Sequence, residues 1–329
     1  MEKRRLGNTD LELTTIGLGT WAIGGGDWKF GWGPQDEQEA VEAVLAAVRH
    51  GINWIDTAAV YGGGVAETLV GKALAMLPVS ERPIVATKCG RVMRGPEQID
   101  KVLKRESIFE ECDASLKRLG VDAIDLYQLH WPEPDEDIEE GWAALVELKQ
   151  QGKVREIGVS NHNVAQLKRL EAIHPVASLQ PPYSLLKREA EKELLPYCAQ
   201  QDIGVVCYSP MYKGLLTGKF TAESLAKLDS SDHRTRDIEF QSPLIEAHLG
   251  LVDCLRSVAD SAGRSLAELA IAWVLRRPEV TSAIVGSRRP DQVAQTVSAA
   301  DWKLSQPQIE TITQLLAGHA QAMRMGALG

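Results

Sequence analysis

The chain has 329 residues, of which 44% are hydrophobic and 25% are charged, with a formal net charge of −9. These fractions exclude a disordered or fibrous chain, and the acidic balance argues against a nucleic-acid partner or an anionic membrane surface. No apolar run approaches the ~18–20 residues that span a bilayer, and no apolar segment follows the basic N-terminus, so we expect a cytoplasmic protein without a membrane partner.

The first elements expected along the chain are a hairpin, a strand and a helix. Gly7 and Asn8 separate two short runs and indicate a hairpin turn, and a strand is predicted over 15–19. Residues 24–34 are rich in Gly and Trp without periodicity, which indicates a loop. A helix with Asp36 as its N-cap follows.

The stretch 51–74 combines a strand, a glycine-rich turn and the start of a helix. Its apolar run 52–55 predicts a buried parallel strand that ends at Asp56, a residue that we do not expect in the core. Tyr61 follows in a turn that three glycines allow, and a helix begins near Glu67. We expect this turn to leave the Tyr61 phenol at the mouth of a cleft.

Strands and helices alternate through the rest of the chain. Further strands are predicted over 84–88, 124–130, 154–159, 176–180, 203–208 and 282–286. Further helices are predicted over 67–76, 107–118, 138–150, 164–173, 189–200, 243–262, 265–276, 290–300 and 307–316, with a long polar connection over 210–241.

Eight strands that alternate with helices favour an α/β chain with one domain over 1–329, a single (β/α)8 TIM barrel with a short N-terminal β-hairpin. A doubly wound sheet with a small second domain is the alternative. That layout usually carries a G-x-G-x-x-G turn after its first strand, and this chain has none there.

Asp56, Tyr61, Lys88 and His130 lie at or just after predicted strand ends, which share one face of a barrel. A Tyr hydroxyl can hand a proton to a carbonyl oxygen that becomes an alkoxide on hydride addition. Lys88 would lower the pKa of Tyr61, Asp56 would hold the lysine, and neutral His130 would orient the carbonyl. A purely structural Asp56–Lys88 ion pair, and a lyase that forms a Schiff base on Lys88, are the alternatives.

Six segments, in order, resemble segments of the aldo-keto reductases: DTAAVYGGGVAE, ATKCG, LYQLHWPEP, GVSNH, YSPMYKGLLTGKF and AIVGSRRPDQ. The resemblance runs through nearly the whole chain. It implies a bacterial-type, NADPH-dependent oxidoreductase that reduces small-molecule aldehydes, and ketones as further substrates, by direct hydride transfer. It also implies that Asp56, Tyr61, Lys88 and His130 form the catalytic tetrad.

The same resemblance implies the cofactor contacts. It places the carboxamide-binding positions on Ser160, Asn161 and Gln180, and the aromatic ring that stacks on the nicotinamide on Tyr208, roles that suit these side chains. Ser160 and Asn161 could equally cap the following helix. The remaining contacts implied are Thr20, Trp21, Asp56, Ser209, Pro210, Met211, Lys213, Gly214, Lys219, Gly286, Ser287, Arg288 and Gln292.

The choice of cofactor depends on a pair of arginines. Arg288 and Arg289 follow the last strand at a helix N-terminus and favour the 2′-phosphate of NADPH, a solvated surface pair being the alternative. Gln295 and Thr296 stand where the family often has a Glu–Asn pair around adenine, which leaves NAD as a weaker alternative.

Four tryptophans suggest an aromatic-lined substrate pocket, unless they simply pack: Trp21, Trp28, Trp32 and Trp131. The connection over 229–241 and the tail after Gly318 are further candidates for its wall. The five cysteines form no C-x-x-C pair and are interpreted as small buried hydrophobic residues, so neither a metal site nor a disulfide framework is predicted.

A rival function is of another class. Some members of the family serve as cofactor-sensing β subunits of ion channels with little turnover, and an intact tetrad permits either role. The acidic chain with short connections favours an ordinary enzyme. We expect a monomer, although the sequence leaves the oligomeric state open, as it does the physiological substrate and the preferred direction of the reaction.

Overall fold

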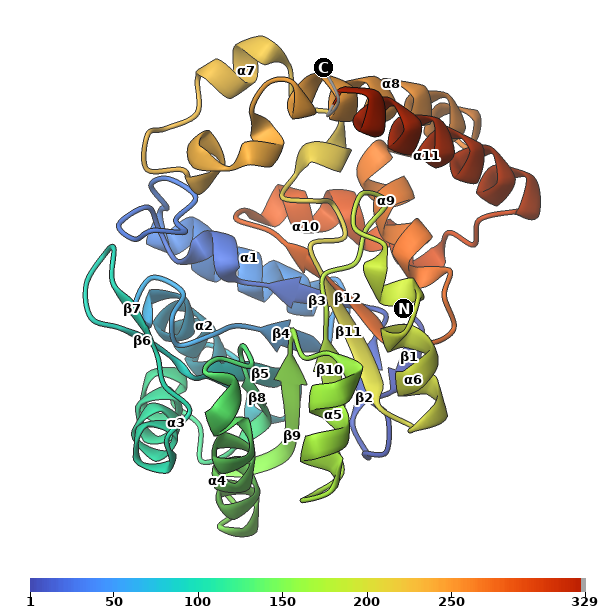
Figure 1. The fold of residues 1–329 in the computed structure, drawn as a ribbon. Helices are drawn as coiled ribbons and strands as arrows, with labels where there is room; N and C mark the ends of the chain where they lie inside the picture. Colours follow the sequence, from blue (N-terminus) through green and yellow to red (C-terminus); the bar gives the residue numbers. More distant parts are fainter. Residues whose placement is uncertain (327–329) are drawn as a thin grey trace.

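The computed structural model describes residues 1–326, and at its centre eight parallel strands form a closed barrel (Figure 1). Around the barrel they are β3 (Ile16–Gly19), β4 (Trp54–Asp56), β5 (Ile84–Cys89), β8 (Ile124–Leu129), β9 (Val154–Ser160), β10 (Ser178–Gln180), β11 (Gly204–Tyr208) and β12 (Ser282–Gly286). β12 pairs with β3 and so closes the ring. The predicted TIM barrel is confirmed.

Helices follow the strands and cover the outside of the barrel (Figure 1). They are α1 (Glu37–Arg49), α2 (Val65–Ala75), α3 (Arg105–Leu119), α4 (Ile138–Gln150), α5 (Val164–Glu171), α6 (Leu194–Gln200), α7 (Ala222–Ala226), α8 (Leu244–Ser261), α9 (Leu266–Leu275), α10 (Pro290–Val297) and α11 (Gln306–Gly326). Asp36 caps α1 as predicted, because its side chain accepts a hydrogen bond from the Glu39 amide at 2.8 Å. No described helix is both long and apolar enough to cross a membrane.

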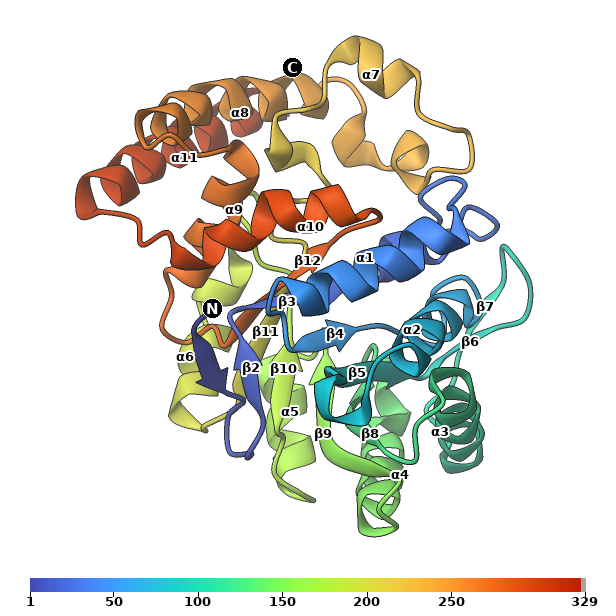
Figure 2. The ribbon, with the colours of Figure 1, turned by 180° about the vertical axis from the view of Figure 1, so that it is seen from behind.

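The predicted N-terminal hairpin closes one end of the barrel. Its strands, β1 (Lys3–Arg5) and β2 (Glu12–Thr14), are antiparallel, and Figure 2 shows them in dark blue on the side of the barrel away from α7. Leu6 and Leu13 are buried in one cluster with Trp54 inside the barrel. Because this apolar plug fills the amino-terminal end, the carboxyl ends of the strands are where a ligand can enter.

One predicted helix is broken. The range 189–200 holds a 3₁₀ turn, Glu189–Glu191, followed by the shorter α6. Pro196 explains the break, since in the interior of a longer helix it would remove one backbone hydrogen bond and clash with the preceding turn. Within α6 it lies in the first turn, where the amide hydrogen has no partner to lose.

Two further elements differ from the prediction. A hairpin of β6 (Arg91–Met93) and β7 (Ile99–Lys101) follows β5, and its short mixed strands carry no alternating pattern. The last helix, α11, runs well beyond the predicted end at Leu316 and lies beside α8 (Figure 1). Its His319 Nε2 lies 3.1 Å from Nδ1 of His248 on α8. This part of the tail therefore packs on α8, while residues 327–329 lie outside the described residues.

The cysteines are mostly as predicted. Four are buried, but Cys254 is exposed on α8. The interpretation as buried hydrophobic residues is therefore wrong for Cys254.

Candidate active site

A buried ion pair forms the base of the site. The Lys88 ammonium on β5 donates to both carboxylate oxygens of Asp56 on β4, each at 2.8 Å, and to the Thr57 carbonyl at 2.8 Å. Asp56 is only 3% exposed and Lys88 1%, so the expectation that Asp56 lies outside the core is wrong. The carboxylate can be buried because the ammonium lies directly against it.

Tyr61 and His130 complete the predicted set of four. The Lys88 ammonium lies 3.3 Å from the Tyr61 hydroxyl, and the Tyr61 and His130 rings meet edge to face with centroids 5.8 Å apart. Gly62, Gly63 and Gly64 have φ angles of 64°, 63° and 98°, which glycine adopts without the strain of a side chain. The tight turn that they form brings the phenol back over the end of β5.

The protonation states of the site follow from burial. Burial, and then the Asp56 carboxylate, raise the pKa of Tyr61 well above its ordinary value, so the expected lowering by Lys88 is wrong for the free protein. The charge of Lys88 is already balanced by Asp56, and burial lowers the Lys88 pKa. Burial, followed by the Lys88 charge, also holds the pKa of His130 well below 6.5. At neutral pH the phenol is protonated and the imidazole is neutral.

A second buried network lies behind β5, and the sequence interpretation missed it. The Glu67 carboxylate, fully buried, accepts from the Thr87 hydroxyl at 2.6 Å and from the Arg118 guanidinium at 2.6 Å. Glu67 shares one face of α2 with Val70 and Leu74, so helical periodicity alone could have marked it as a buried charge. Close by, the Glu111 carboxylate accepts from the Gly90 amide at 3.0 Å. These contacts hold the end of the strand that carries Lys88.

The predicted carboxamide contacts adjoin the set of four. Gln180 donates its amide to Asp56 at 2.8 Å, and the Ser160 hydroxyl donates to the Gln180 carbonyl at 2.9 Å. The alternative in which Ser160 and Asn161 cap the next helix is wrong, because Asn163 caps α5 in a capping box with Gln166.

Asn161 links neighbouring strand ends. Its side-chain amide donates to the His130 carbonyl at 3.0 Å, and its oxygen accepts from the Tyr208 hydroxyl at 2.9 Å. Its φ of 64° lies in the left-handed region, which Asn tolerates better than most residues. Across the barrel, the Thr20 hydroxyl donates to the Asp56 carbonyl at 2.9 Å. The predicted cofactor residues at the strand ends therefore form one network with Asp56 and His130.

The loop from Ser209 to Lys219, which includes Pro210 and Met211, has an unusual backbone. Ser209, Tyr212, Lys213 and Gly214 all have positive φ angles, between 47° and 89°. Left-handed residues in such a turn can form the concave arrays of backbone amides that bind anions. The two lysines already have partners, since Lys213 pairs with Asp237 and Lys219 donates to Gln295 at 3.0 Å.

The guanidinium of Arg288 is bonded only to neutral groups in the described structure. It donates to the Gln35 side-chain oxygen at 2.7 Å, to the Trp32 carbonyl at 2.8 Å and to the Pro34 carbonyl, all of them neutral. Within residues 1–326 it makes no ion pair, and burial and then Arg234 lower its pKa. An anion is the group that would balance this charge.

The neighbours of Arg288 also suit a phosphate. Arg289, in contrast to Arg288, pairs with Asp291 at 3.0 Å. Gln292 accepts the Arg288 amide at 2.7 Å, and Ser287, 3% exposed, follows Gly286 at the end of β12. The end of β12 and the loop from Ser209 to Lys219 therefore fit the phosphate groups of a dinucleotide.

Three of the four predicted pocket tryptophans lie together. The Trp28 ring lies 6.3 Å from that of Tyr61, and the Trp21 and Trp32 rings meet edge to face at 5.2 Å. Trp131 is separate, 38% exposed and beside the Arg91 guanidinium. The sequence interpretation did not single out His233, whose ring lies 4.9 Å from both Trp21 and Trp32.

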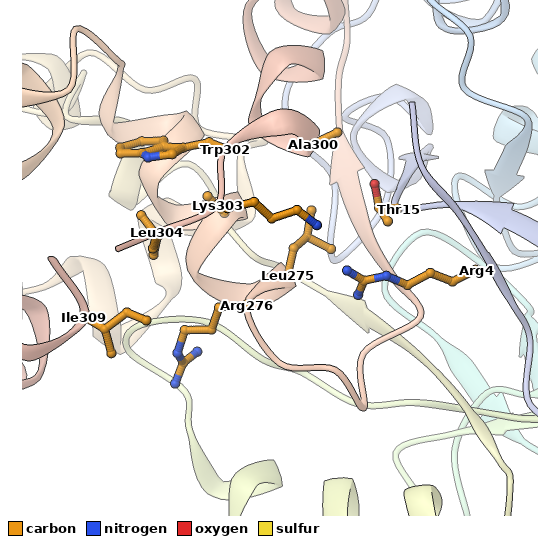
Figure 3. Close-up of a pocket in the computed structure, with 10 residues that line it drawn as sticks. Arg4, Thr15, Leu275, Arg276, Ala300, Trp302, Lys303, Leu304 and Ile309 are labelled. Atoms are coloured by element: carbon orange, nitrogen blue, oxygen red, sulfur yellow. The ribbon is translucent and has the colours of Figure 1, made fainter. Parts of the chain in front are cut away.

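A pocket of about 140 Å³ at the other end of the barrel is not part of this site (Figure 3). It is lined by Arg4 and Thr15, from the chain that leads into β3, and by residues near the ends of α9 and α10, among them Arg276. Arg4 pairs with Glu2, and Arg276 with Glu191, so these cations already have partners. The groups suited to carbonyl chemistry lie at the carboxyl end.

A closed parallel barrel with polar and titratable side chains gathered at the carboxyl ends of its strands defines the class of (β/α)8-barrel enzymes. Residues 15–317 match the model of the Aldo/keto reductase family. The chain is 38% identical over 317 residues to "Aldo-keto reductase YhdN" of Bacillus subtilis, covering 96% of this chain and 94% of that protein. We conclude that it belongs to the aldo/keto reductase family, a family of oxidoreductases.

Two further comparisons bear on function. The chain is 39% identical over 321 residues to an "NADH-specific methylglyoxal reductase" of Escherichia coli, covering 93% of this chain and 95% of that protein. The structure of the present chain is similar to that of the glycerol dehydrogenase AKR11B4 from Gluconobacter oxydans, with a TM-score of 0.86 and 36% sequence identity. The match covers 96% of this chain and 95% of that protein. The family is established, whereas the relatives differ in the activities that their names record.

Proposed function

We propose that this oxidoreductase reduces the carbonyl group of small aldehydes, and of ketones as further substrates, with NADPH as the hydride donor. The observation that carries the proposal is the position of the Lys88 ammonium, 2.8 Å from Asp56 and 3.3 Å from the Tyr61 hydroxyl, with the His130 ring beside the phenol. Membership of the aldo/keto reductase family supports it.

Tyr61 is the proton donor in this proposal. Its raised pKa keeps the hydroxyl protonated at neutral pH, and the adjacent Lys88 ammonium would stabilise the phenolate that forms when the proton leaves. Asp56 holds the ammonium in place. The neutral His130 imidazole offers one N–H, which would orient the carbonyl oxygen and stabilise the charge that develops on it. When bound, the reduced nicotinamide supplies the hydride.

The cofactor would extend along the carboxyl ends of the strands. Ser160, Asn161 and Gln180 would bind its carboxamide, and Tyr208 would lie on the nicotinamide ring. The reason to propose NADPH rather than NADH is that the Arg288 guanidinium forms no ion pair among the described residues. The NADH-specific relative in Escherichia coli makes this choice a question for experiment.

Cofactor preference can be tested with a matched pair of variants. Arg288→Ala should raise the Kd for NADPH about tenfold or more, since a charged contact to the phosphate is lost, and should change the Kd for NADH much less. Arg289→Ala is the control, because its charge is paired with Asp291. Equal effects of Arg288→Ala on both cofactors would contradict the preference for NADPH.

The reductase itself is tested by following NADPH and NADH oxidation with a reactive aromatic aldehyde. Tyr61→Phe should retain cofactor binding, measured by fluorescence quenching, and lose about 10²–10⁴-fold in kcat. If the wild type binds cofactor but reduces none of a broad set of carbonyls, the rival role as a cofactor-sensing subunit is favoured instead.

A further inference from the structure

Three loops meet beyond the carboxyl ends of the strands. The rim loop, residues 24–34, follows β3, and the phosphate loop, residues 209–219, follows β11. The facing loop, residues 229–241, lies between α7 and α8. Its Arg236 guanidinium donates to the Lys29 carbonyl of the rim loop at 2.9 Å. The facing loop therefore adjoins the mouth of the barrel, and its own position bears on what lies there.

The facing loop also holds the phosphate loop. The Lys213 ammonium pairs with the Asp237 carboxylate, and the Arg234 guanidinium donates to the Lys213 carbonyl at 3.2 Å. Lys213 has a φ of 55°, in the left-handed region that residues with a side chain rarely adopt. Such a backbone persists only where surrounding contacts hold it in place. The facing loop supplies two of these contacts.

A buried histidine on α8 fixes the facing loop in turn. The Glu239 amide donates to the Asp237 carboxylate at 3.1 Å, and the Glu239 carboxylate lies 2.8 Å from Nε2 of His248. Because a carboxylate can only accept, this nitrogen carries a proton. His248 is 3% exposed, and its ring meets the Tyr212 ring of the phosphate loop edge to face, with centroids 6.0 Å apart. One side chain of α8 thus contacts both loops.

The second ring nitrogen of His248 reaches α11, which lies beside α8 (Figure 1). Its Nδ1 is 3.1 Å from Nε2 of His319. Burial, and then the neighbouring His248, lower the pKa of His319, so near pH 7 the His319 ring is neutral and offers one N–H and one lone pair. It can donate to a neutral His248 or accept from a protonated one, so this contact forms in either state.

Helix packing alone does not require these polar groups. An apolar pair between α8 and α11 would bury a similar surface without any polar atom to satisfy. Two imidazoles lose their hydration there, and hydrogen bonds must offset that cost. The bonds that do so join the two rings to each other and His248 to Glu239. The polar contacts therefore tie the loops to the helices in addition to packing one helix on the other.

We propose that His248 is a positioning residue for the cofactor. By holding Glu239 and the Tyr212 ring, it keeps the phosphate loop in the left-handed form that binds the pyrophosphate of the nicotinamide cofactor. His319 supports it from α11. Its contacts lie in the loops and in α11, so its effect falls on cofactor affinity and not on the chemical step at Tyr61. The inference rests on the proposed reductase function and adds residues outside the site that set its cofactor affinity.

The test is the Kd for each cofactor, measured by fluorescence quenching. His248→Leu fills most of the same space but cannot donate to Glu239, so the Kd for NADPH and that for NADH should both rise about tenfold, without a fall in kcat at saturating cofactor. His248→Gln, whose amide can donate to Glu239, should restore most of the affinity. His319→Ala loses only the outer contact and should raise both values about two- to threefold.

A matched variant on the same helix controls for lost stability. Leu255 is 1% exposed and packs in the core, so Leu255→Ala should destabilise the fold but keep the wild-type Kd. An unchanged Kd in His248→Leu, an equal rise in Leu255→Ala, or a Kd for His248→Gln no lower than for His248→Leu overturns the positioning role and leaves the reductase in place. If the wild type binds neither cofactor and reduces no carbonyl, both proposals fail.

Discussion

The strand ends of the site and the loops above them are built in opposite ways. At the strand ends, the Lys88 ammonium and the Asp56 carboxylate are buried and bonded to each other, and Gln180 donates to the same carboxylate. In the loops, Arg288 has only neutral partners and His233 Nε2 has none among the described residues. The buried ion pair is complete without a ligand, whereas the loop groups have bonding capacity left for one, as does the buried Nδ1 of His130 at the strand ends.

This difference suggests that the strand ends carry out proton transfer and that the loops recognise the cofactor and the substrate. Groups that handle a proton must keep a fixed geometry, and rigid strand ends provide it. Groups that recognise a cofactor or substrate gain from being unpaired beforehand, because the ligand then supplies the missing partner. We therefore expect substitutions at the strand ends to change stability and turnover, and substitutions in the loops to change binding and selectivity.

The largest effect should come from breaking the buried pair. Lys88→Met leaves the Asp56 carboxylate without a counterion, which should lower the free energy of unfolding by about 3–5 kcal/mol and abolish measurable turnover. Denaturant unfolding and carbonyl reduction measure the two effects. The double variant Asp56→Asn/Lys88→Met removes both charges and should regain most of the stability but none of the activity. A double variant as unstable as the single one would show that charge is not the cause.

Glu111 should give the strand-end region a pH-dependent stability. Burial raises the pKa of its carboxyl from 4.5 to about 7, so the folded protein binds this proton more tightly than the unfolded chain. The resulting stability is fully present below pH 4.5 and is lost as the pH rises through 7. Between pH 4.5 and 7 the free energy of unfolding of the wild type should fall by about 2–3 kcal/mol more than that of Glu111→Gln. Denaturant unfolding at several pH values measures both. Parallel pH curves for the two proteins would contradict this assignment.

Asp36 tests whether stability near the loops can change without activity. It follows the rim loop and caps α1 through the Glu39 amide at 2.8 Å. Asp36→Ala should lower the free energy of unfolding by about 1 kcal/mol, with kcat unchanged for the preferred aldehyde. Asp36→Ser, which can still cap, is the control. A loss of kcat in Asp36→Ala alone would mean that the cap also positions the site.

The smallest effect is expected for the contact between the two loops. The Arg236 guanidinium is exposed and donates to one rim-loop carbonyl at 2.9 Å. Arg236→Ala should change the free energy of unfolding by less than about 0.5 kcal/mol, because exposed contacts of this kind contribute little. Any change in KM should be small, and steady-state kinetics would detect it. A loss of several kcal/mol would show that the loops are part of the rigid region after all.

Local patterns were enough to predict the barrel and the four residues at its strand ends. The alternation of short apolar runs with amphipathic helices predicts eight strands, and the structure confirms each of them. α4 was predicted at its observed bounds, Ile138–Gln150. The helix predicted over 189–200 is broken because Pro196 interrupts its pattern. The hairpin of β6 and β7 was not predicted because its short strands carry no alternating pattern.

The sequence by itself determined the fold class and the family, and it predicted that Asp56, Tyr61, Lys88 and His130 lie together at the strand ends, because periodicity and ordered motifs are properties of neighbouring residues. Only the tertiary structure decided which of these groups are charged and which loop groups lack partners. Burial sets the pKa of Tyr61 and His130, and depends on the whole barrel. The contacts of His233 with Gly31, and of Arg288 with Trp32, join residues far apart in the chain, which no local pattern encodes.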